Sequence, residues 1–155
     1  MKLVNSTGNV WRGRAQSVLR VVSAFLFMSH GMQKILSFPV APAAPTQWLS
    51  MSGIAGLLEL VGGLLLLLGL FTRPVAFILC GEMAVAYFIA HAPRGFWPLL
   101  NRGELAALYS FVFLYLAAAG GGPWSLDAWW NRRRLDDEWR RDRTFGARAA
   151  SLTRS

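Results

Sequence analysis

The sequence predicts an all-α integral membrane protein, a four-helix bundle with its N and C termini in the cytoplasm. Hydrophobic residues make up 54% of the 155 residues and charged residues only 15%, whereas ordinary soluble domains carry about 25% charged residues. The apolar residues gather into stretches of roughly 20, the length that a helix needs to cross the hydrocarbon core. The net charge of +8 sits mainly at the chain ends, which argues against nucleic-acid binding.

The first predicted span covers residues 17–36 and is the least apolar of the four. It contains three basic residues: Arg20, His30 and Lys34. A signal peptide is the competing interpretation, because Arg12 and Arg14 precede the apolar run and residues 41–43 resemble a cleavage site. Lys34 and many other residues separate the apolar run from that site, so we expect a retained transmembrane helix.

The other predicted spans cover residues 52–71, 74–91 and 104–119. Glu59 is the only charged residue in the range 52–71, and Glu82 lies inside the range 74–91. Three glycines and a proline follow the last span and predict its end. Residues 17–123 therefore form one membrane domain.

Lysine and arginine counts predict the orientation, because positively charged loops stay in the cytoplasm. The N-terminal segment 1–16, the turn at 72–74 and the tail 124–155 all carry basic residues. With four spans, these three regions fall on the same side. We therefore expect a multi-pass protein of the bacterial inner membrane, surrounded by its lipid bilayer.

The tail alternates tryptophans with arginines and aspartates. Tryptophan favours the membrane interface, and arginine favours anionic headgroups. Ser125 is placed to cap a short helix, so we expect a helix lying on the inner surface over 127–141 and disorder after Arg143. A solvated end that merely fixes the topology is the alternative.

Ionisable side chains inside the membrane are costly and mark functional sites by default. A rise of 1.5 Å per residue sorts them by depth into two groups. We expect Arg20 and Glu82, in the inner group, to form a structural ion pair. The outer group could move protons or bind a polar head group; its members are His30, Lys34, Glu59, His91 and Glu104, with Asn101 in the adjoining loop. No spacing motif predicts a metal site.

Several short motifs occur in a specific order along the chain. They are L-R at 19–20, H-G-x-x-K at 30–34, L-E-L-V-G-G at 58–63, L-G-L-F-T-R-P at 68–74, H-A-P-x-G-F-x-P-L-L-N at 91–101, G-E-L at 103–105 and S-L-D at 125–127. This pattern resembles the DoxX family of small four-helix bacterial inner-membrane proteins. The resemblance covers about residues 17–127 and implies a link to membrane oxidoreductases and to redox or thiol homeostasis.

The first functional hypothesis is a quinone-interacting or accessory subunit of a membrane oxidoreductase. Glu59 would exchange protons and His30 would hydrogen-bond a quinone carbonyl. The remaining substrate-binding residues would be Lys34, His91, Glu104 and Asn101. With a single cysteine and no haem or flavin motif, we expect no covalently bound cofactor, and any electrons would come from a protein partner.

Two hypotheses from other classes stay open, and whether the chain is an enzyme is also open. In one, the protein is a non-catalytic anchor or scaffold that docks a cytosolic partner through its basic tail. In the other, it is a small proton-coupled transporter, for which a chain of this length would require an oligomer. A homo-oligomer is compatible with each of these hypotheses.

Overall fold

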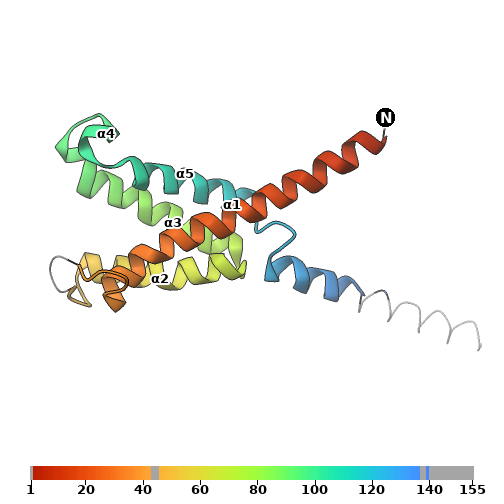
Figure 1. The fold of residues 1–155 in the computed structure, drawn as a ribbon, viewed down its shortest axis with the longest axis horizontal. Helices are drawn as coiled ribbons and strands as arrows, with labels where there is room; N and C mark the ends of the chain where they lie inside the picture. The colour runs from red at the N-terminus through yellow and green to blue at the C-terminus, as the bar shows by residue number, and fades with distance from the viewer. Residues whose placement is uncertain (1, 43–45, 137–138, 140–155) are drawn as a thin grey trace, which may run out of the picture.

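The structure, a computed structural model, describes residues 2–42, 46–136 and 139, and this part of the chain is helical without strands. Four long helices make up most of it: α1 (Lys2–Leu36), α2 (Met51–Leu68), α3 (Thr72–Ala86) and α5 (Glu104–Ala119) (Figure 1). The chain after α3 continues through short turns: η1 (Tyr87–His91), η2 (Ala92–Arg94) and α4 (Pro98–Asn101). A further helix occupies residues 126–136.

The long helices pack in two pairs. α1 lies along α2 and α3 lies along α5, with a smaller contact between α2 and α3. The beginning of α1 and the helix at 126–136 project from the same end of the molecule, and α4 lies at the opposite end (Figure 1). Both ends of the described chain thus lie at the same end of the molecule.

α2 has defined signals at both ends. The Ser50 hydroxyl accepts a hydrogen bond from the Gly53 N–H at 3.1 Å and caps the first turn. Gly69 ends the helix in the left-handed conformation, with a φ of 68°, which glycine adopts without the steric cost of a Cβ. The predicted range 52–71 therefore ran past the end of this helix.

The start of α3 is fixed by a side chain from the far end of the chain. The Asp127 carboxylate accepts hydrogen bonds from the Phe71 N–H at 2.9 Å and the Thr72 N–H at 2.8 Å. A carboxylate at this position satisfies orphan N–H groups and complements the helix dipole. Ser125 caps the helix at 126–136, as predicted, by accepting from the Ala128 N–H at 3.1 Å.

The interior is apolar and aromatic. Phe27 of α1 meets Tyr109 and Phe113 of α5 in edge-to-face contacts, with ring centroids 5.2 and 4.8 Å apart. Leu66 and Leu79 are buried beside them. This cluster joins the two helix pairs at the level of the middle of α5.

Two of the described helices are long and apolar enough to cross a membrane: Met51–Leu68, with 33% of its residues buried, and Thr72–Arg94, with 17% of its apolar 18-residue stretch buried. Their low burial leaves large apolar side chains facing outward, among them Phe77 and Phe88. α5 is apolar but shorter, at 16 residues. α1 does not meet the same test, since charged and polar residues interrupt its apolar run.

The first helix departs most from the prediction. α1 begins at Lys2, well before the expected residue 17, so the N-terminal segment continues the same helix. The helix predicted over 127–141 is seen over 126–136. Its expected extension to Arg141 and the disorder expected after Arg143 lie outside the described residues.

Candidate functional site

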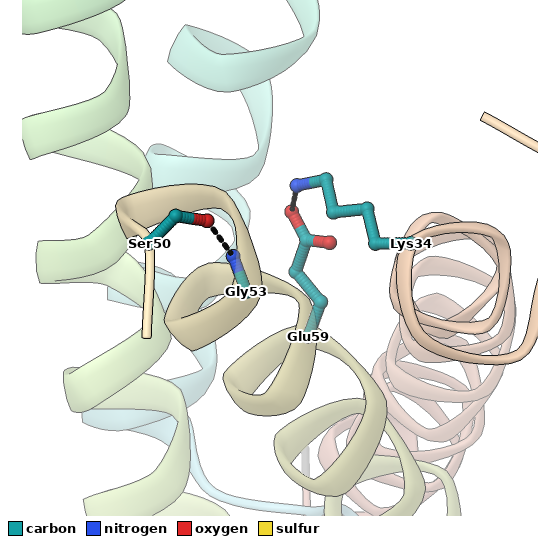
Figure 2. Close-up of polar contacts among 4 residues, drawn as sticks. All are labelled: Lys34, Ser50, Gly53 and Glu59. Atoms are coloured by element: carbon teal, nitrogen blue, oxygen red, sulfur yellow. Dashed lines mark hydrogen bonds and ion pairs between the residues drawn. The ribbon is translucent and has the colours of Figure 1, made fainter. Parts of the chain in front are cut away.

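Three helices each contribute one charged side chain to a cluster in the interior. Lys34 of α1 reaches across to Glu59 of α2, and its Nζ lies 2.6 Å from the Glu59 Oε1 (Figure 2). The side chain of Glu59 is only 5% exposed and that of Lys34 is 30% exposed. The ion pair is therefore partly shielded from its surroundings, and Lys34 forms its outer side.

Glycines let α1 and α2 approach closely enough for this pair to form. A Cβ added at Gly56 would lie 2.8 Å from the Cβ of Lys34, and a Cβ added at Gly31 would lie 2.8 Å from the Gly56 carbonyl oxygen. Any larger residue would push the helices apart. Gly31 of α1 and Gly56 of α2 thus act in helix packing.

Glu82 of α3 belongs to the same cluster. It lies within the range of electrostatic interaction with both Glu59 and Lys34. Neither of its carboxyl oxygens has a hydrogen-bond partner among the described residues, and neither has the Glu59 Oε2. We call Lys34, Glu59 and Glu82 the charged cluster; it combines two buried carboxyl groups with one ammonium group.

The ion pair predicted between Arg20 and Glu82 is wrong. Arg20 is completely buried, and its guanidinium donates instead to backbone carbonyls. The acceptors are Leu66, Leu67 at 2.6 Å, Gly121 at 2.8 Å and Trp124 at 2.9 Å. The last carbonyls of α2 lack helical partners, and their dipole attracts a cation, so Arg20 is held at the end of α2.

His91 and Asn101 meet in the loop beyond α3. The His91 Nδ1 lies 3.0 Å from the Asn101 carbonyl oxygen. The Asn101 side chain is buried and shapes the loop, because it donates to the Gly95 carbonyl at 2.7 Å and accepts from the Gly103 N–H at 2.8 Å. Its amide is therefore occupied by the protein itself.

His30 and Glu104 are exposed. His30 lies one helical turn before Lys34 on α1, and Glu104 begins α5. Of the predicted outer group, the structure brings Lys34 next to Glu59 and His91 next to Asn101. It adds Glu82 to the first pair, which the depth estimate had placed in the inner group.

Sequence reasoning also missed the role of Asp127. This residue ties the helix at 126–136 to the start of α3. An acidic residue placed two positions after a helix-capping serine gave no sign that its partner would be a turn more than fifty residues earlier. Only the packing of the chain ends brings the two together.

Outward-facing apolar helices around a small buried set of charges define the class of a small helical membrane protein. The chain belongs to the DoxX family, whose model matches residues 15–92. The resemblance seen in the sequence motifs is thereby confirmed.

Three relatives fit this assignment. An uncharacterized protein of Haemophilus influenzae is 48% identical over 114 residues, covering 70% of this chain and 85% of the relative. The inner membrane protein YqjF of Escherichia coli is 30% identical over 125 residues, covering 75% and 92%. The uncharacterized membrane protein Rv3486 of Mycobacterium tuberculosis is 29% identical over 131 residues, covering 70% and 77%. No solved structure matches the chain.

Proposed function

We propose that this protein is a quinone-interacting subunit of a bacterial inner-membrane oxidoreductase, and that its charged cluster exchanges protons with the quinone. The observation that carries the proposal is the imbalance of the cluster. Two carboxyl groups from α2 and α3 share the single ammonium of Lys34. Buried charges need partners, so one of the two carboxyl groups holds a proton.

A carboxyl group that keeps a proton inside the membrane can deliver it to a bound acceptor. Reduction of a quinone to a quinol consumes two electrons and two protons, and its two carbonyl oxygens become hydroxyl groups. A partner oxidoreductase subunit supplies the electrons. Glu59 and Glu82 pass the protons one at a time, and the emptied carboxylate is reprotonated from the aqueous side.

His30 has a place in this scheme because it is exposed one turn from Lys34. An imidazole there can donate a hydrogen bond to a quinone carbonyl that approaches from the lipid. The partial exposure of the Lys34 side chain, at 30%, leaves that side of the cluster open to such a ligand. His91 and Asn101 are left to shape the loop, and Glu104 has no assigned part.

The proposal includes the membrane arrangement. α1, α2, the helix from α3 through η2, and α5 each cross the inner membrane, with both termini in the cytoplasm. Arg73 in the first turn of α3 and the arginines of the tail favour this orientation. α5 measures about 24 Å at 1.5 Å per residue, so the bilayer thins locally to match it.

Quinone bound to the purified protein is the first test. The full chain is purified in mild detergent, and the quinone in an organic extract is quantified per chain. We expect about one quinone per chain in the wild type, and less in Glu59→Gln and in His30→Ala. Asp136→Asn is the matched control, because it removes an exposed carboxylate outside the spans. Background quinone in folded wild-type protein contradicts the proposal.

The anchor hypothesis makes the opposite prediction for the same variants. The helix at 126–136 projects from the packed helices and carries exposed Arg132, Arg133 and Arg134 (Figure 1). If the protein only docks a partner there, deleting residues 129–155 abolishes function while Glu59→Gln is silent. The quinone-site proposal expects Glu59→Gln to impair redox activity in membranes that contain the complete complex.

A further inference from the structure

We propose that a cleft at the end of the molecule from which α1 and the helix at 126–136 project binds the phosphate headgroup of an anionic phospholipid. The α2–α3 turn, the glycines that follow α5 and the helix at 126–136 form its walls. Its volume is about 610 Å³. The side chains that set the charge and the rim of the cleft are Arg73, Asp127, Trp130 and Arg134.

The place of the cleft in the membrane follows from the turn that forms one wall. α2 ends at Leu68 and α3 begins at Thr72, and both belong to apolar stretches of membrane-spanning length. A turn this short between two such helices must lie where they leave the hydrocarbon core. The cleft therefore lies at the depth of the lipid headgroups.

The charges of the cleft favour an anion. The guanidinium groups of Arg73 and Arg134 are exposed and have no acidic partner within 4.0 Å in the described part of the chain. The Asp127 carboxylate is also in the wall, but the Phe71 and Thr72 N–H groups already engage it. Two arginines without an acidic partner among the described residues outnumber the one carboxylate and leave the cleft with a net positive charge, and paired arginines suit phosphate oxygens.

The rest of the wall fits a lipid better than a free ion. Phe71 and Trp130 are 62% and 52% exposed and present aromatic surface at the rim, where tryptophan favours the membrane interface. Thr72 is completely buried, and its Oγ1 has no partner among the described residues. Gly121 lies against this hydroxyl, since a Cβ there would be 2.7 Å from it.

Native mass spectrometry of the full chain in neutral detergent tests the proposal. Phosphatidylglycerol, phosphatidylcholine and inorganic phosphate are titrated separately. We expect phosphatidylglycerol to bind more tightly than phosphatidylcholine. Inorganic phosphate should show no measurable binding. The double variant Arg73→Gln, Arg134→Gln should bind phosphatidylglycerol roughly 30-fold more weakly, because each arginine near an anionic surface contributes about a factor of five.

The matched control is the double variant Arg94→Gln, Arg133→Gln, which loses the same charge outside the cleft. It should keep wild-type affinity. Equal losses in the two double variants, or none in the first, overturn the proposal. If inorganic phosphate binds as tightly as phosphatidylglycerol, the cleft is a site for a free anion, and the lipid proposal is overturned. If the double variant fails to fold, each single variant should show about a fivefold loss.

Discussion

Replacing Arg20 with methionine should destabilise the protein more than any surface substitution. The guanidinium is completely buried and holds three parts of the chain together: the end of α2, the glycines after α5, and Trp124. Methionine keeps much of the apolar stem and adapts to irregular gaps. The comparison therefore isolates the hydrogen bonds from the packing.

The magnitude follows from the bonds that are lost. Hydrogen bonds from a charged donor contribute about 1.5–3 kcal/mol each, but the Leu66 carbonyl keeps a second partner, since it also accepts from the Gly69 N–H at 3.0 Å. Methionine leaves the Leu67, Gly121 and Trp124 carbonyls without this donor, and a buried polar group left unsatisfied costs about 1–3 kcal/mol. We expect the free energy of unfolding to fall by about 3–4 kcal/mol for Arg20→Met. Arg20→Lys should lose roughly half of that, because an ammonium cannot span the same carbonyls.

The assay is reversible unfolding in mixed micelles with increasing dodecyl sulfate, followed by tryptophan fluorescence. Arg133→Met is the control, because its guanidinium is exposed and stacks over the Trp129 ring at 3.9 Å. It should change the free energy of unfolding by less than about 1 kcal/mol. If Arg20→Met lowers the free energy of unfolding by less than about 1 kcal/mol, the hydrogen bonds of Arg20 do not hold these three parts of the chain together.

Four further predictions follow from the same contacts. Gly63→Ala should cost about 1–3 kcal/mol through overpacking, since its Cβ would lie 2.8 Å from the Met28 Cβ, whereas Gly81→Ala has open space and should be neutral or stabilising in the same assay. Asp127→Ala should cost about 1 kcal/mol and speed proteolytic removal of the tail; an unchanged cleavage rate contradicts the cap. The infrared band of a protonated carboxyl group should be present in the wild type and lost or shifted in Glu82→Gln. Reporter fusions in the α2–α3 turn and at the C terminus should label the cytoplasm, and one in the η2–α4 loop the opposite side.

The helices could be predicted from the length of the apolar stretches and from the glycine and proline residues that end them, because both are local properties of the sequence. The range 104–119 coincides with α5, and the glycines after it mark its end. The start of α1 could not be found in this way. A helix whose sequence turns polar loses its apolar signal but keeps its backbone hydrogen bonds, so α1 continues back to Lys2.

The candidate site was harder to predict because depth is only one of three coordinates. The rise per residue placed Lys34 and Glu59 in the same outer group, and the structure pairs them. The rise per residue says nothing about lateral position, and it placed Glu82 in the inner group, apart from Glu59. The partners of Arg20 could not be found by pairing charges at all, because they are backbone carbonyls.

The length of α1 links distant parts of the molecule. Its 35 residues extend about 52 Å, well beyond a hydrocarbon core of about 30 Å. Lys34 stands near one end of this rod, and Gln16, which donates to the Gly120 carbonyl at 2.6 Å, stands nearer the other. An unbroken helix is stiff along its axis. A shift of α1 along that axis would therefore change two contacts together: the Lys34–Glu59 ion pair and the hydrogen bond from Gln16 to the Gly120 carbonyl.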